Sequence, residues 1–381
     1  MRKALATVTL IGFAIWISGC GKSDPTGESN EIPIGEYSSL TGTTATFGTS
    51  THRGILMAVE EINSGGGVLG KKIKLITEDT RSLPEEAALA VQKLITRDNV
   101  VSIIGEIASS RSLAAAPICQ ERKVPMVSPG STNPEVTKKG DYIFRVCYID
   151  PFQGEVLAKF AYNSLGLRKV ATLKDVKNDY SVGLAQFFYD TFTKLGGEVV
   201  GEQAYSEGDN DFKAQLTALK ALNPEGIFVP GYYTESALIV KQARELNMPM
   251  PFFGGDGWDS DRLLEIGGAA MNGTYFTNHY SADDTSQMVQ KFVAKYRSLH
   301  NNETPDAMAA LGYDAAMVVF DAIRRAGSTD CTKIRDMLAT TVDFPGIAGK
   351  TTIDAERNAR KSAVIISIEN SKLVFRETVQ P

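Results

Sequence analysis

Residues 100–128 read VVSIIGEIASSRSLAAAPICQERKVPMVS, and this stretch contains one complete strand–helix–strand unit. Val100–Gly105 and Val124–Ser128 are short apolar runs, which predicts two buried strands. Between them, Ser109–Gln120 has the length and composition of a helix. Two strands that are joined through a helix lie parallel in a sheet that helices cover. This unit therefore predicts a parallel α/β fold.

The same alternation extends along the chain on both sides of this unit. Before it, we predict strands over 32–37 and 72–78, helices over 52–63 and 82–94, and a loop over 38–50. Ser82 and Glu85 fit a capping box at the start of the second of these helices. After residue 150, we predict strands over 169–174, 198–205, 226–231, 251–254 and 273–278, and helices over 152–165, 181–195, 211–222, 234–246, 287–299 and 305–326. Two such series with a break near Asp150 predict two similar lobes with helices on both sheet faces.

Ligands of open parallel sheets bind beyond the carboxyl ends of the strands. The segments that follow the predicted strands are rich in Ser, Thr, Gly, Tyr and Asp, and they are 38–50, 106–109, 129–133, 175–180, 232–233 and 255–259. Ser109 fits a helix N-cap, but hydroxyl and free N–H groups at a helix start also bind anions. Residues 128–134 fit a turn, or a carboxylate cradle together with Ser109. If the two lobes face each other, these segments line the cleft.

Several functional classes find little support in the sequence. The net charge is −5 without basic clusters, which argues against a nucleic-acid partner. Gly65–Gly70 matches G-x-G-x-x-G, but it follows a predicted helix and precedes a strand, so we interpret it as a connector and expect no nucleotide cofactor. His52, His279 and His300 are isolated, so we expect them to be surface or structural residues and not metal ligands. These observations favour a binding protein over an enzyme.

The cysteines of the body are far apart in the sequence. Cys119, Cys147 and Cys331 show no C-x-x-C spacing, so neither a zinc site nor a redox dithiol is indicated. Three cysteines cannot all pair within one chain, so at least one thiol stays free unless it pairs between chains.

The N-terminus predicts export. Met1–Lys3 is basic, residues 4–16 are mostly apolar but too few to span a bilayer, and Ile17–Cys20 ends in small residues before a cysteine. The sequence Ile-Ser-Gly-Cys resembles the lipobox of bacterial lipoproteins. That resemblance implies a signal peptide over 1–19, lipid on Cys20 and a polar tether over 20–31. The alternative is an ordinary secretory peptide that leaves Cys20 as a free thiol.

The order and spacing of several motifs resemble one family as a set, and these motifs are Ser39–Gly42 with Phe47-Gly48, Ile103–Gly105 leading to Ser109, Ser128–Pro134, Gly231–Tyr233 and Gly254–Gly257. The family is the branched-chain amino-acid (leucine/isoleucine/valine) binding proteins of bacterial ABC importers. The resemblance runs from about Ile32 to near the C-terminus. It implies the type I periplasmic binding protein fold, with two Rossmann-like lobes and a hinge of three segments. The first lobe is expected over 32–150 plus 280–345, and the second over 151–279 plus 346–381.

The same resemblance implies the ligand-binding residues. Ser109 and Thr132 match the positions that hold a ligand carboxylate, whereas the Ser131–Thr132 region and Asp256 match those that hold the ammonium. The positions that match the pocket walls or flank the site are Phe47, Ala108, Tyr180 and Tyr232, and we expect Trp258 to narrow or cap the pocket. Asp256 is shorter than the Glu that leucine receptors often have here, which leaves the identity of the ligand open.

We therefore expect a monomeric lipoprotein in the periplasm or at the cell surface that delivers an apolar or aromatic L-α-amino acid to ABC permease subunits. One alternative is the same fold with an aromatic or other carboxylic acid as its ligand. In that case, Asp256 would face no cation. A second alternative is a ligand sensor that signals through another partner. The sequence favours the first, because an anion cradle in one lobe and Asp256 in the other would pair both charges of a buried zwitterion.

Overall fold

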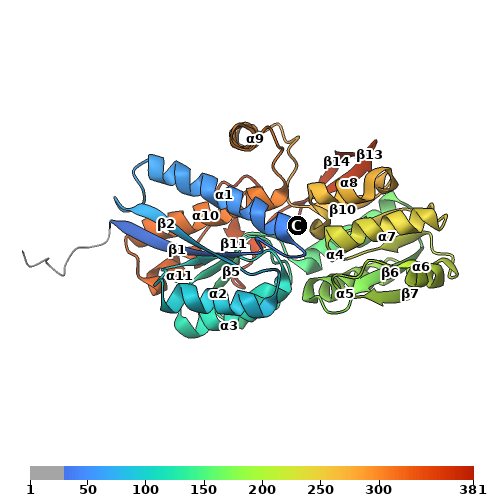
Figure 1. The fold of residues 1–381 in the computed structure, drawn as a ribbon, viewed down its shortest axis with the longest axis horizontal. Coiled ribbons are helices and arrows are strands. Elements are labelled where there is room, and N and C mark those ends of the chain that lie inside the picture. Colours follow the sequence, from blue (N-terminus) through green and yellow to red (C-terminus); the bar gives the residue numbers. More distant parts are fainter. Residues whose placement is uncertain (1–29) are drawn as a thin grey trace, which may run out of the picture.

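The computed structural model describes residues 30–381 and has two α/β lobes that lie side by side (Figure 1). The sheet of the first lobe has the strand order β2-β1-β3-β4-β5, and all of its neighbouring strands are parallel. Its strands are β1 (Glu31–Ser38), β2 (Lys72–Asp79), β3 (Ile103–Ile104), β4 (Met126–Ser128) and β5 (Ile143–Arg145). The stretch over 100–128 supplies its centre as β3, helix α3 and β4, so the predicted parallel α/β fold is confirmed.

The sheet of the second lobe has the order β14-β13-β10-β9-β8-β6-β7. The strands from β7 to β10 are parallel, whereas β13 and β14 are antiparallel to their neighbours. The strands are β6 (Lys169–Asp175), β7 (Glu198–Tyr205), β8 (Gly226–Phe228), β9 (Phe252–Gly254), β10 (Tyr275–Asn278), β13 (Ala363–Glu369) and β14 (Lys372–Val379). The hairpin of β13 and β14 and the small antiparallel pair β11 (Thr352–Ile353) and β12 (Ala359–Arg360) were not predicted from the sequence.

Helices cover both faces of each sheet (Figure 1). In the first lobe, α1 packs against α10 and α2 packs against α3, while α4 packs against α5 and α7 against α8 in the second lobe. The helices are α1 (Ala45–Ser64), α2 (Pro84–Thr96), α3 (Ser109–Arg122), α4 (Asp150–Lys159), α5 (Asp179–Lys194), α6 (Lys213–Lys220), α7 (Tyr233–Glu245), α8 (Asp261–Gly267), α9 (Gln287–Leu299), α10 (Ala307–Ala326) and α11 (Cys331–Ala339). None of the helices within residues 30–381 is long and apolar enough to cross a bilayer.

The helix α1 begins seven residues earlier than predicted, and the reason is tertiary packing. Thr46 and Gly48 are weak helix formers, so the sequence favoured a loop there. In the structure, the backbone at Gly48 lies so close to Ser39 that an added Cβ would stand 2.0 Å from the Ser39 carbonyl oxygen. Only glycine allows this approach, which brings the first turn of α1 to the end of β1.

The predicted capping box at Ser82 is wrong. Leu83 is the N-cap of α2, and no side chain caps that helix. The Ser82 hydroxyl instead donates to the Thr41 carbonyl oxygen (2.8 Å) and accepts from the Thr44 backbone N–H (3.2 Å). This hydroxyl therefore fixes the loop that leads into α1.

The residue boundaries of the two lobes stay a prediction, although core packing bears on the last of them. Ile353 and Ala359 belong to the same buried cluster as Ile32 and Ile55 of the first lobe. Ala363 begins β13 of the second sheet. This packing supports moving the third crossing between the lobes, which the sequence placed at residue 346, towards residue 361. Residues 1–29, with the predicted signal peptide, most of the predicted tether and Cys20, lie outside the described part of the chain.

We predict that the buried ion pair beside this crossing is required for stability. Asp314 of α10 accepts from the backbone N–H groups of Ile347 (2.6 Å) and Ala348 (2.9 Å) and lies 3.3 Å from the Lys361 ammonium, and both charged side chains are buried. Asp314→Ala leaves the Lys361 charge unpaired, so the free energy of unfolding should fall by ~3–5 kcal/mol.

Urea unfolding of both variants measures this, with Asp321→Ala on the same helix as the control. The Asp321 side chain pairs with Arg325 near the surface (2.6 Å), so its loss should cost about 0–1 kcal/mol. Equal losses in the two variants would contradict a structural role for the buried pair.

Candidate binding site

A narrow cavity lies between the two lobes at the carboxyl ends of their strands. The first lobe contributes Phe47, Ile107, Gly130, Thr132 and Met308, and the second contributes Tyr180, Tyr232, Asp256 and Gly257. The cavity is small, since the volume open to the centre of a water molecule is only about 10 Å³. A larger ligand therefore requires the lobes to separate or side chains to rotate.

The second lobe presents a buried carboxylate to this cavity. Asp256 opens a short 3₁₀ turn (Asp256–Trp258) directly after β9, and only 3% of it is exposed. Its Oδ1 accepts from the Tyr180 hydroxyl (2.9 Å) and from Nε2 of Gln153 (2.8 Å). Its Oδ2 lies 2.9 Å from Nε2 of His279. These donors, from α5, α4 and the end of β10, hold the carboxylate in one orientation.

Aromatic rings from both lobes form a wall of the cavity. Tyr180 and Tyr232 stack with their ring centroids 5.4 Å apart, and the Phe47 ring meets the Tyr232 ring edge-on at 5.5 Å. Burial and the nearby Asp256 charge raise the pKa of Tyr180 well above its ordinary value, so this phenol stays a neutral donor. The Tyr232 hydroxyl is buried and has no hydrogen-bond partner within the described chain.

The first lobe presents small polar groups opposite this wall. The Thr132 side chain is buried, and its Oγ1 has no hydrogen-bond partner in the described part of the chain. Ser109 is the first residue of α3, so Ala108 takes the N-cap position, and the Ser109 hydroxyl accepts from the Asn133 backbone N–H (3.2 Å). Free hydroxyl and N–H groups near a helix start suit an anion. Because the Thr132 hydroxyl is buried and unpaired, it is the strongest candidate for a polar contact with a ligand.

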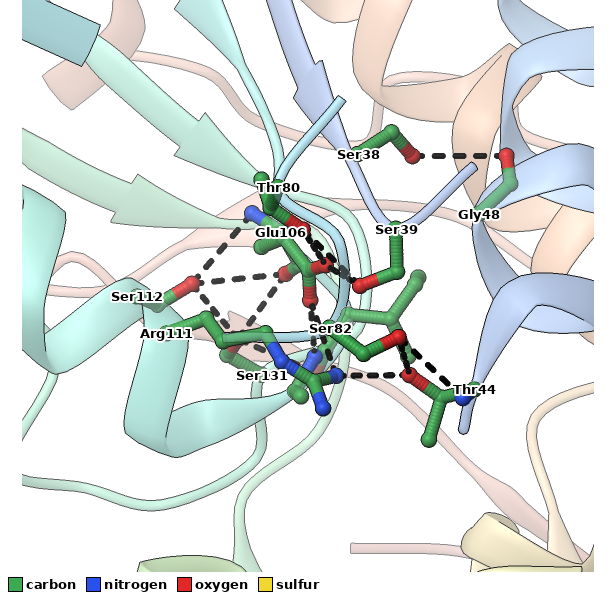
Figure 2. A network of polar contacts seen from close by, with 12 residues as sticks. Ser38, Ser39, Thr44, Gly48, Thr80, Ser82, Glu106, Arg111, Ser112 and Ser131 are labelled. Atoms are coloured by element: carbon green, nitrogen blue, oxygen red, sulfur yellow. Dashed lines mark hydrogen bonds and ion pairs between the residues drawn. The ribbon is translucent and has the colours of Figure 1, made fainter. Parts of the chain in front are cut away.

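The loop that carries Thr132 is fixed from behind by a polar network around Glu106 (Figure 2). The buried Glu106 carboxylate accepts from the hydroxyl groups of Ser39 and Thr80 and from the Ala108 backbone N–H (2.7 Å), and Arg111 lies 3.9 Å away. The Ser131 hydroxyl belongs to the same network and lies 2.8 Å from the Glu106 backbone oxygen.

Another part of this network reaches the second lobe. Arg111 donates to the Thr44 hydroxyl (2.7 Å) and pairs with Glu207 after β7 (3.2 Å). Thr43 also donates to Glu207. Glu207 therefore links the rims of the two lobes in this conformation.

The structure brings five of the residues singled out from the sequence to the cavity, and they are Phe47, Thr132, Tyr180, Tyr232 and Asp256. Ala108 and Ser109 lie just behind the lining, where both are buried. The Ser131 hydroxyl is turned into the Glu106 network, so it faces the protein interior.

Trp258 corrects our expectation of a pocket wall, because it lies in the core of the second lobe. Its indole N–H donates to the Val229 carbonyl oxygen (3.0 Å), and the side chain is fully buried beneath Gly254. The indole packs against Gly254, where an added Cβ would stand 2.2 Å from Nε1 of Trp258, so the missing side chain leaves room for the ring. The residues that line the cavity and that we did not predict are Ile107, Gly130, Gly257 and Met308.

Other candidate sites have weaker support. A larger groove, about 840 Å³, lies over α1, α9 and α10 of the first lobe, and none of the buried polar atoms without partners lines it. Among residues 30–381, no cluster of His, Cys, Asp and Glu could hold a metal ion. Cys119, Cys147 and Cys331 are free thiols. The cavity between the lobes therefore remains the best candidate.

Comparison with known proteins agrees with this geometry. The family model of periplasmic binding proteins matches residues 31–368. The crystal structure of a leucine-binding protein, LivK from Thermotoga maritima, is 44% identical over 92% of this chain and 99% of its own, with a TM-score of 0.89. A branched-chain amino-acid transporter substrate-binding protein, LivJ from Streptococcus pneumoniae in complex with isoleucine, is 34% identical over 92% and 100%, with a TM-score of 0.87.

A third solved structure has a different ligand. The ABC transporter solute-binding protein of Rhodopseudomonas palustris BisB5, in complex with 3,4-dihydroxybenzoic acid, is 27% identical over 92% of this chain and 98% of its own, with a TM-score of 0.82. The matching family consists of binding proteins that work outside the cytoplasm, which agrees with our expectation of an exported binding protein. Because the match covers nearly all of the described residues and both lobes, this chain belongs to the periplasmic binding protein family.

Proposed function

We propose that this protein binds an L-α-amino acid with an apolar side chain between its lobes and delivers it to an ABC permease. The observation that carries this proposal is the pairing of opposite chemistries across one cavity. Thr132 and the start of α3 suit a carboxylate, and Asp256 suits an ammonium group. A buried zwitterion needs both partners. The relatives whose titles name leucine and isoleucine support the same ligand class.

The walls of the cavity support an apolar side chain on that ligand. Ile107, Met308 and the aromatic rings of Phe47 and Tyr232 offer mainly carbon atoms. Burial of such a side chain contributes ~25 cal/mol per Å² of apolar area. The permease partner and a monomeric state are part of this proposal.

We predict that free leucine, isoleucine or valine stabilises the protein against heat. Stabilisation should grow as RT ln(1 + [L]/Kd), which reaches ~2.7 kcal/mol when the ligand is at 100 times its Kd. A thermal-shift panel of amino acids and benzoates at several concentrations measures this. An increase in melting temperature with benzoates alone would refute an amino-acid ligand.

That outcome would favour the second candidate, an aromatic carboxylic acid. The stacked rings of Tyr180 and Tyr232 and the relative in complex with 3,4-dihydroxybenzoic acid support it. Asp256 counts against it, because a benzoate has no cation to offset a buried carboxylate. A ligand sensor would give the same binding results as a transport protein. Transport assays with an ABC permease encoded beside this protein would distinguish a sensor from a transport protein.

We predict that Asp256→Ala and Asp256→Asn both weaken amino-acid binding strongly. Removing one member of a buried charge pair typically costs ~2–5 kcal/mol, which corresponds to a factor of about 30 to several thousand in Kd. Isothermal titration calorimetry measures the loss. The control is Asp261→Asn, an exposed carboxylate at the start of α8, which should leave Kd unchanged. Near-wild-type affinity in both Asp256 variants would show that this carboxylate does not bind the ligand.

We further propose that Cys20 carries the lipid that anchors the protein to a membrane. The basic start, the short apolar run and Ile-Ser-Gly-Cys support this assignment. Two acyl chains are enough for stable anchoring, whereas one chain is marginal. Cys20→Ser should abolish lipid attachment and impair processing, and a chain that begins near Ser29 should bind ligand normally. Cell fractionation and mass spectrometry test this, and a cleaved but unmodified N-terminus on a wholly soluble wild-type protein would contradict the anchor.

A further inference from the structure

His279 is one of the histidines that the sequence marked as isolated, and the structure places it beside Asp256. It follows β10 directly, at one of the expected crossings between the lobes. Its side chain is fully buried, and its ring stacks on the Tyr148 ring with centroids 3.7 Å apart and planes inclined by 23°. The backbone N–H of His279 donates to the Asn278 side chain (2.8 Å). The ring is therefore held in one orientation.

The hydrogen-bond capacity of Asp256 links its contact with His279 to ligand binding. A carboxylate has about four acceptor positions, two on each oxygen. The Tyr180 hydroxyl and the Gln153 amide fill both positions on Oδ1. His279 uses one position on Oδ2, so the remaining position on that oxygen is open to a ligand donor. The ligand and His279 therefore share one oxygen atom.

The hydrogen bonding of His279 indicates a neutral ring. A neutral imidazole that donates through Nε2 has a bare Nδ1, and the buried Nδ1 of His279 indeed has no partner among the described residues. A protonated ring would bury an N–H without an acceptor and would place a positive charge at Oδ2. Burial lowers the pKa of His279, and the contact with Asp256 offsets part of that decrease.

One other charged group near His279 acts in the same direction as burial. The Lys361 ammonium, from the segment before β13, also disfavours a charge on the imidazole. Tyr148 stacks on the ring as a neutral phenol, since burial raises its pKa well above the ordinary value. On the hinge side, His279 lines a cavity of about 400 Å³ together with Asp283 and Asp284.

Three further groups lie behind Asp256. Asp150 is fully buried, and burial raises its pKa well above the ordinary value, while the nearby Thr132 hydroxyl and Arg145 guanidinium act in the opposite direction. The pKa of Asp259 is raised to about 6 by burial. Cys147 is a buried thiol with a raised pKa. Protonated Asp150 and Cys147 carry no charge that would replace the one on Asp256, whereas Asp259 is ionised above about pH 6.

We propose that His279 is a positioning residue of the binding site, whose neutral Nε2–H aims Asp256 at the ligand and whose protonation competes with the cationic group of the ligand for Oδ2. This inference rests on the proposed binding of an amino acid. When the lobes are apart and water reaches the ring, His279 should titrate nearer to the ordinary histidine pKa of ~6.5. Closure on a cationic group then releases that proton. Because the free protein binds the extra proton, affinity should fall as the pH falls through this range, by up to about tenfold per pH unit.

Calorimetric titration of the full chain with leucine between pH 8 and pH 5 tests this proposal. The wild type should bind more weakly as the pH falls. At pH 6, titrations in two buffers of different ionisation enthalpy should reveal proton release. His279→Gln keeps an N–H donor that does not titrate, so its Kd should stay nearly constant over the same range. The matched control is His52→Gln, which removes a histidine that pairs with Glu36 in the first lobe (2.7 Å) and should keep the wild-type profile.

The results separate this inference from the proposed function. If the wild type binds leucine with the same Kd at pH 8 and pH 5 and releases no proton, the inference is wrong while amino-acid binding stands. The same conclusion follows if His279→Gln keeps the wild-type slope. If no amino acid binds at pH 8, the proposed function fails and this inference fails with it. Should His279→Gln not fold, proton release by the wild type alone decides the question.

Discussion

An ionised carboxylate that is buried in protein must receive hydrogen bonds, and the structure around the cavity satisfies this requirement for Asp256. Gln153 comes from α4, Tyr180 from α5 and His279 from the end of β10. These elements are distant in sequence, and they converge because parallel strands bring their carboxyl ends to one edge of a sheet. Each of them is tied to the core by its own packing, so the negative charge of Asp256 has a fixed place. The wall of stacked aromatic rings starts from the same Tyr180 ring.

The first lobe also contains a buried carboxylate, and all of its hydrogen-bond donors come from that lobe. The lobes can therefore move relative to each other without disturbing it. Glu106 is buried and takes its donors from hydroxyl groups, a backbone N–H and Arg111, all within that lobe (Figure 2). Arg111, which pairs with Glu207, is buried, but other contacts that cross between the lobes are partly exposed, such as the contact of the Thr46 and Ser260 hydroxyl groups (3.0 Å). Water can replace contacts of this kind at modest cost. Opening therefore separates the lobes without breaking the network that shapes either half of the site.

The sequence predicted those parts of the molecule that local pattern determines. The alternation of strands and helices is a property of short segments, so the core of both sheets and α9 (Gln287–Leu299) were predicted closely. β14 was missed because it is mostly exposed and carries little hydrophobic periodicity, whereas β13 is a buried apolar run that we did not single out. Met308 was missed because it lies at the start of a helix far along the chain, where nothing in the local sequence points to a cavity. Trp258 was misplaced because adjacency to Asp256 in sequence says little about direction in a tight turn, where successive side chains diverge.

The length of Asp256 links the network to the choice of ligand. An Asp side chain is one methylene shorter than Glu, so its carboxylate stays close to the backbone turn after β9. Gln153 and Tyr180 hold Oδ1 from the protein side, and only Oδ2 is left for a ligand. In the proposed binding mode, the cationic group of the ligand reaches Asp256 in the second lobe, while its carboxylate stays at Thr132 in the first lobe. The distance between these two anchors is then set by how far the lobes close, and a small zwitterion with both charged groups on one carbon suits the narrow cavity between them.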